Sequence, residues 1–286
     1  MNKRIITIII ALAAICSGAS AQPKNAYCPS PNNRGAGKMA VVDTTRIRVW
    51  YAFNADDVKD ENTYIDHQRL DIGKRVTKYY SEFLFRSDSL IVEWKKAHPG
   101  AEAVPGFLGN GEKKQDKWSE YEYSDLFISN GELTEYATMP LSLVKYNSYY
   151  TEPYPLQQWT MGTETQDILG HRCQKATCHW RGRDYVAWFT SAIPLKSGPW
   201  KFGGLPGLIM KVYDTKYVYT WEAVAVENGA FPIYQPEERY YKKSTREKVW
   251  KMQGEWNRRF NELSGMLDFN FRPKTQRYSY DPLELE

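Results

Sequence analysis

Apolar and polar residues alternate along much of this chain, and Gly, Pro and Asn residues interrupt the alternation at short intervals. Alternation with a period of two gives a strand one apolar face, so the pattern predicts many short β-strands. The longest is expected over 39–53, and the most apolar over 208–214. The other expected strands are 64–70, 75–80, 125–130, 132–138, 143–150, 158–161, 168–180, 185–190 and 217–226.

Two stretches change to helical spacing. Residues 81–98 carry apolar side chains at roughly helical spacing, and Pro99-Gly100 would end a helix there. Residues 244–263 alternate apolar residues with Lys and Arg, and Ser244 with Glu247 forms a capping-box pattern. We expect this second, amphipathic helix to lie on the sheet, although a basic amphipathic helix can also lie on a membrane surface.

Strands that follow one another through short turns form an antiparallel meander. The expected fold class is therefore mainly β (α+β): a curved antiparallel meander sheet or open barrel, with one mid-chain helix and a C-terminal amphipathic helix packed on it. The expected organisation is a signal peptide over 1–21, a flexible lead-in over 22–38, a single domain over 39–264 and an extended or disordered tail over 265–286.

The first residues have the pattern of an export signal. A basic start is followed by an apolar run over 5–15, and Ala19-Ser20-Ala21 suits cleavage before Gln22. Cys16 is an alternative site of lipidation, but Ile15 precedes it where a small residue is usual. No later stretch approaches the roughly 20 apolar residues of a transmembrane helix. We expect an exported protein, periplasmic or associated with the outer membrane, that is not transmembrane.

Composition narrows the ligand classes. Removal of Lys3 and Arg4 with the signal lowers the formal charge from +4 to +2, and a near-neutral chain argues against a nucleic-acid partner. Aromatic residues make up 15% of the chain, with 21 Tyr and 10 Trp. They predict either an aromatic-rich core or a binding groove lined by Trp and Tyr.

Three cysteines would remain after cleavage. An odd number leaves one thiol without an intramolecular partner. In one continuous strand Cys173 and Cys178 would lie about 16 Å apart, and a disulfide needs Cα atoms within about 7 Å. Either the chain turns at 174–177 and this pair is the candidate disulfide, or Cys28 supplies the partner.

His171, Cys173, Cys178 and His179 are all of metal-ligand type. Only His171 and Cys173 would lie close together on one strand face, about 7 Å apart. No second group of ligands stands nearby in the sequence. We therefore expect neither a metal nor another cofactor.

The stretch 197–214 is the densest in residues that dictate the backbone. The motif residues singled out for this structural role are Gly198, Pro199, Trp200, Gly203, Gly204, Leu205, Pro206 and Gly207. The Pro206-Gly207 pair suits a type II turn with positive φ at the glycine. We expect an ordered double turn that leads into the buried strand 208–214, and a phosphate loop is disfavoured because a strand follows rather than a helix.

This part of the chain resembles a known family. The resemblance is carried by Cys173-Gln174-Lys175-Ala176-Thr177, by Arg181-Gly182-Arg183-Asp184-Tyr185-Val186-Ala187-Trp188-Phe189-Thr190, by Ile193-Pro194, by Gly198-Pro199-Trp200-Lys201-Phe202 and by Gly204-Leu205-Pro206-Gly207-Leu208-Ile209. These residues are similar to the GLPGLI family, secreted proteins of Bacteroidetes also known from Porphyromonas. The strong similarity covers roughly 170–227, and 73–89 is similar more weakly. The resemblance implies an envelope protein encoded near outer-membrane transport systems, and it supplies no activity and no catalytic residue.

The sequence contains no complete catalytic set. The nucleophile-elbow pattern Gly-x-Ser-x-Gly is absent. Asp184, Asp214 and Glu222 lie on or beside central strands, where a carboxylate pair could hydrolyse glycosides. Their simpler role is in turns and ion pairs, and Arg183 beside Asp184 is interpreted as such a turn pair.

We therefore expect a non-enzymatic binding or accessory protein of the cell envelope. Its ligand would be hydrophobic or extended, such as a lipid or peptide, or its partner an outer-membrane transport protein. The alternative is an envelope hydrolase that uses carboxylates on the central strands.

Overall fold

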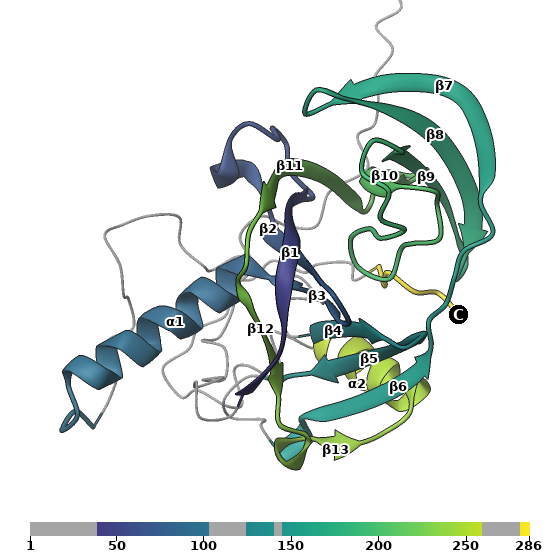
Figure 1. Cartoon of the computed structure of the whole chain (residues 1–286). Helices are drawn as coiled ribbons and strands as arrows, with labels where there is room; N and C mark the ends of the chain where they lie inside the picture. Colours follow the sequence, from purple (N-terminus) through teal and green to yellow (C-terminus); the bar gives the residue numbers. More distant parts are fainter. Residues whose placement is uncertain (1–38, 103–123, 140–144, 259–280) are drawn as a thin grey trace, which may run out of the picture.

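The computed structural model describes residues 39–102, 124–139, 145–258 and 281–286. Within these residues thirteen strands form one large, mostly antiparallel sheet that curves strongly (Figure 1). One helix, α1 (Glu82–Ala97), follows the third strand, and a second, α2 (Arg246–Arg258), follows the last. The predicted mainly β fold with a mid-chain and a late helix is confirmed. The expected signal peptide and lead-in lie outside the described residues.

The order of strands in the sheet is β13-β6-β5-β4-β3-β2-β1-β11-β10-β9-β8-β7, with β12 paired to β1 beside this path. Most neighbours in the sheet are thus neighbours in the sequence, as in a meander, and β13 pairs with β6 in parallel. The strands are β1 (Met39–Phe53), β2 (Asp66–Gly73), β3 (Thr77–Ser81), β4 (Ser124–Ser129), β5 (Glu132–Ala137), β6 (Ser148–Pro153), β7 (Thr160–Ile168), β8 (His171–Trp180), β9 (Arg183–Thr190), β10 (Leu208–Asp214), β11 (Thr220–Asn228), β12 (Pro232–Pro236) and β13 (Lys242–Lys243).

Some strand bounds differ from those predicted, although β1 and β10 begin and end where expected. Strand β7 is longer than the predicted 158–161, and β8 is shorter than 168–180. The reason is a tight turn at Leu169 and Gly170, where φ is 51° and 75°. Strand β6 starts and ends later than predicted, and β12 and β13 were not predicted at all.

The two helices differ in how well their starts were predicted. The hydroxyl of Ser81 accepts from the amide of Leu84 and caps α1. The predicted cap of α2 at Ser244 is wrong by one residue, because the hydroxyl of Thr245 accepts from the Lys248 amide at 3.4 Å. Ser244 instead extends the sheet, since its amide donates to the carbonyl of Tyr149 on β6.

Helix α2 packs against β6, which confirms its predicted place on the sheet, and α1 contacts β2 and β3. In the described part of the chain, no helix is long and apolar enough to cross a bilayer.

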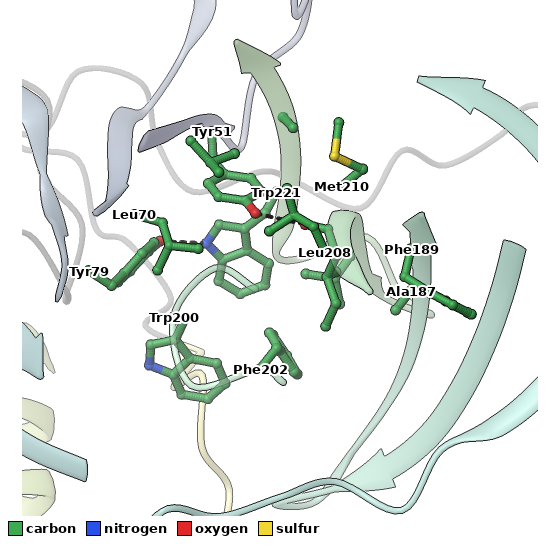
Figure 2. Packing of buried hydrophobic residues seen from close by; sticks show 14 of the residues in the cluster. Tyr51, Leu70, Tyr79, Ala187, Phe189, Trp200, Phe202, Leu208, Met210 and Trp221 are labelled. Carbon is green, nitrogen blue, oxygen red and sulfur yellow. Dashed lines mark hydrogen bonds between the residues drawn. The ribbon is translucent and has the colours of Figure 1, made fainter. Parts of the chain in front are cut away.

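Aromatic side chains fill the interior of the curved sheet. The loop 191–207, between β9 and β10, folds into the concave side and brings Trp200 and Phe202 into the main core (Figures 1 and 2). The rings of Trp200 and Trp221 stack nearly parallel, with centroids 6.1 Å apart. The indole of Trp221 also donates to Gln68 and to the hydroxyl of Tyr79. These aromatic residues therefore form a closed core rather than the lining of an open groove.

The predicted type II turn with positive φ at Gly207 is wrong. In this loop the residues with positive φ are Trp200 at 50° and Gly204 at 83°. Gly207 is required for another reason, the close approach of two backbone segments. A Cβ atom on Gly207 would lie 2.1 Å from the carbonyl oxygen of Thr190, at the end of β9.

We predict that Gly207→Ala lowers the free energy of unfolding by more than about 1 kcal/mol, because the backbone must shift to admit a methyl group. Gly100→Ala is the matched control, since a Cβ there meets no atom within 4 Å. Urea unfolding measures both variants. A midpoint for Gly207→Ala equal to that of the unaltered chain would contradict the close packing.

Candidate functional site

Residues 281–286 run back into the fold and lie against the loop 191–207 (Figure 1, yellow). Leu283 is fully buried in the main core, and Glu284 is 2% exposed. The predicted extended or disordered tail is therefore anchored in this segment by buried Leu283 and Glu284, whereas Leu285 and Glu286 are exposed. Residues 265–280 lie outside the described part. Two apolar and three acidic residues make up the segment with Pro282.

One arginine holds the first half of the segment. Arg183, on β9, donates to the carboxylate of Asp281 at 2.5 Å and to the carbonyl of Pro282 at 2.5 Å. Its Nε also donates to the carbonyl of Leu283 at 3.1 Å. The prediction that Arg183 forms a turn ion pair with Asp184 is wrong, because Arg183 is buried and faces the segment.

Two further side chains and one backbone carbonyl group form hydrogen bonds with the main chain of the segment. The hydroxyl of Tyr219 donates to the carbonyl of Asp281, and the indole of Trp250 donates to that of Glu284. The Leu285 amide donates to the carbonyl of Arg181 at 3.1 Å. Such contacts fix an extended backbone without depending on the side chains that it carries.

The carboxylate of Glu284 meets three cations. Its Oε1 lies 2.6 Å from Lys201 Nζ and 2.6 Å from Arg181 Nη1. Its Oε2 accepts from Arg246 Nε, on α2, at 2.9 Å. Burial alone would raise the pKa of Glu284, but these three cations outweigh it and lower the pKa from 4.5 to about 2.

Lys201 is the most deeply placed of the three cations, with 2% exposure. Its ammonium also lies 2.9 Å from Glu135 Oε2 on β5 and donates to the hydroxyl of Tyr150 on β6 at 2.9 Å. Burial lowers the pKa of Lys201, but Glu135 and Glu284 together hold it well above its ordinary value. Two carboxylates thus keep one buried ammonium charged.

The stretch between β6 and β7 holds the backbone around Lys201. Gln157 Nε2 donates to the carbonyl of Lys201 at 3.1 Å, and the hydroxyl of Tyr154 donates to that of Phe202 at 3.0 Å. The indole of Trp159 donates to the carbonyl of Gly203 at 2.8 Å. These three bonds set the position of the lysine in the interior of the sheet.

We call the side chains that bind residues 281–286 the acidic-segment site. It comprises Arg181, Arg183, Tyr185, Lys201, Tyr219, Arg246 and Trp250. The site can hold an extended, acidic polypeptide, because it presents donors to carbonyl groups and cations to a carboxylate.

The three carboxylates considered for hydrolysis have separate roles. Asp184 is exposed and lies 2.7 Å from His179. Glu222 lies 2.7 Å from Lys211. Asp214 is buried and accepts from the backbone amides of Lys216 and Tyr219 in the turn before β11. Each of these three carboxylates therefore has its own local partner.

The cysteines and histidines of β8 form no site in the structure. Cys173 and Cys178 are both free and buried, and β8 is continuous, so the chain does not turn at 174–177. Burial raises the pKa of Cys173 to about 11 and that of Cys178 to about 12. Cys28 lies outside the described residues. Within the described ranges no group of three or more His, Cys, Asp or Glu could hold a metal ion.

The prediction from sequence missed the residues that matter most here, Lys201 and Glu284. One signal was present: Lys201 interrupts the aromatic pair Trp200 and Phe202 in a stretch otherwise free of charge. Another was the pair of arginines around Gly182. Nothing local marks Glu284 as their partner, because it lies 83 residues beyond Lys201.

One family of known proteins is similar to the part of the chain that contains four residues of the acidic-segment site. A family model described as "Protein of unknown function (Porph_ging)" matches residues 180–211. The resemblance to the GLPGLI family inferred from the sequence is confirmed over this segment. The matched residues include Arg181, Arg183, Tyr185 and Lys201, four members of the acidic-segment site.

Two solved structures of PNGF-II are also similar to this chain. The one in space group C2 has 15% identity and a TM-score of 0.48, over 74% of this chain and 33% of that one. The one in space group P21 has 15% identity and a TM-score of 0.46, over 76% of this chain and 34% of that one. This chain therefore spans about a third of their length. No curated protein matches the chain.

We predict that Glu284 contributes to the acid dependence of stability. Its pKa is lowered on folding, so its contribution is complete above its unfolded pKa of 4.5 and is lost as the pH falls toward 2. In Glu284→Gln the loss of unfolding free energy between pH 7 and pH 2.5 should be smaller by roughly 2–3 kcal/mol. Glu286→Gln, an exposed change in the same segment, is the control. Urea unfolding measures the unaltered chain and both variants at the two pH values. An equal loss of unfolding free energy in all three chains would contradict the ion cluster.

Proposed function

We propose that this chain is a non-enzymatic binding protein of the cell envelope whose acidic-segment site takes an extended polypeptide. The ligand would be a peptide or an extended stretch of a partner, such as an outer-membrane transport protein. The observation that carries this proposal is the way residues 281–286 are held. Four consecutive carbonyls, from Asp281 to Glu284, accept hydrogen bonds from side chains of the site.

This mode of contact suits recognition rather than catalysis. Arg183, Tyr219 and Trp250 donate hydrogen bonds to main-chain carbonyl groups, which every polypeptide has. A buried leucine and a buried glutamate add side-chain contacts to this backbone binding. Peptide-binding proteins combine the same two elements, main-chain hydrogen bonds for affinity and pockets for selectivity.

A polypeptide ligand is better supported than a lipid. The large aromatic side chains, including Trp200, Phe202 and Trp221, pack against one another in the core. The side chains that contact the main chain and Glu284 of the segment 281–286 are charged or hydrogen-bonding, and Leu283 packs in the apolar core. Export to the periplasm or the outer membrane is part of the proposal, and the apolar run at 5–15 supports it.

The proposal predicts that a peptide binds in trans once the internal segment is weakened. The probe is the capped, fluorescently labelled peptide Asp-Pro-Leu-Glu-Leu-Glu, which copies residues 281–286. The receptor is the full chain with Leu283→Ala, which removes the apolar anchor of the segment and leaves the site intact. The internal segment competes at high effective concentration, so its weakening should improve the apparent affinity by about tenfold or more.

The matched control is the full chain with Leu285→Ala. Leu285 is 44% exposed, so its truncation should leave the internal segment in place and the apparent affinity as it is in the unaltered chain. Fluorescence anisotropy measures all three receptors. If the peptide binds none of them, or binds the two variants equally, the acidic-segment site is not a peptide-binding site.

A further inference from the structure

We infer that the ligand of the acidic-segment site is an acidic peptide with a leucine directly followed by a glutamate, and that residues 281–286 are an internal copy of it. This inference rests on the proposed function and adds to it the chemistry that selects the ligand. The main-chain contacts accept many sequences, so selection must come from the two buried side chains, Leu283 and Glu284.

Charge balance sets the requirement for the acid. Lys201, Arg181 and Arg246 all contact the Glu284 carboxylate. Among the described residues, the other acidic side chains in ion pairs with these cations are Glu135, which contacts Lys201, and Glu152, which contacts Arg181. With Glu284 the cluster has three positive and three negative groups, and without it one positive charge stays uncompensated.

Because the cluster is buried, an uncompensated charge in it would be strongly destabilising. Lys201 and Glu135 are each 2% exposed, and the side chain of Arg181 is 10% exposed. Water cannot replace a missing carboxylate in such a place as well as it does at the surface. A ligand with a neutral residue at the Glu284 position leaves a buried ammonium poorly paired, and a site of this kind rejects it strongly.

The neighbouring positions have weaker requirements. The position of Leu283 lies fully within the core and takes an apolar side chain. At the position of Pro282 the carbonyl group accepts a hydrogen bond from Arg183. This contact needs no amide hydrogen, so proline is accepted there. The position of Leu285 is 44% exposed and uses its backbone amide, so its side chain can vary.

The experiment compares three capped peptides on the full chain with Leu283→Ala. The first copies residues 281–286, the second carries glutamine at the Glu284 position, and the third carries glutamine at the Glu286 position. We expect the second to bind at least thirtyfold more weakly than the first, and the third to bind within about threefold of it. Affinity for the first peptide should also fall as the pH drops below the free glutamate pKa of about 4.5, because the bound form requires the carboxylate.

The outcomes separate this inference from the proposed function. If the first and second peptides bind equally well, the site takes extended peptides but does not select an acid, and the inference is overturned while the proposed function stands. If no peptide binds, both are overturned.

A second receptor keeps the test valid if Leu283→Ala fails to fold. In the full chain with Glu284→Gln the Leu283 anchor remains, and the first peptide should raise the melting temperature while the glutamine peptide should not. Equal shifts with the two peptides would again overturn the inference.

Discussion

The structure depends on one buried ammonium group, that of Lys201. It lies inside a curved sheet among aromatic rings, where an unpaired charge would be strongly destabilising. The two carboxylates that pair with it come from distant parts of the chain, Glu135 on β5 and Glu284 in the segment 281–286. Because the lysine needs both, the loop 191–207, the sheet and the segment 281–286 must come together. A surface ion pair could not impose such a constraint.

The backbone geometry of the loop 191–207 holds that lysine in place. Gly207 has no side chain, so the loop can pack closely against the carbonyl group of Thr190. Trp200 adopts a positive φ that places its ring in the core. Side chains between β6 and β7 bind the backbone next to Lys201. A bulky residue with positive φ is strained and persists only where its surroundings fix it. The glycines and prolines of this stretch thus hold the loop in place, and Lys201 between them is the residue that the loop contributes to the acidic-segment site.

The sequence predicted most of the fold and little of the site. Alternation and turn residues are local signals, so β1, β10, α1 and the start of α2 could be recognised within two residues. The predicted end of α2 at residue 263 lies outside the described residues. The turn at Leu169 and Gly170 was missed because a leucine rarely adopts positive φ. The site was missed because it joins residues about a hundred positions apart, such as Arg183 and Leu283. The residues that look catalytic, Asp184, Asp214 and Glu222, turned out to be local partners of other groups.

The loop 191–207 and the segment 281–286 are coupled through the direct ionic contact between Lys201 and Glu284. A double-mutant cycle of Lys201→Met and Glu284→Gln, measured by urea unfolding, tests it most directly. We predict a coupling free energy of at least about 1.5 kcal/mol, since two buried groups in contact do not respond independently. The parallel cycle with Glu286→Gln should be additive. Additivity within about 0.5 kcal/mol for the first cycle would contradict a direct contact between Lys201 and Glu284.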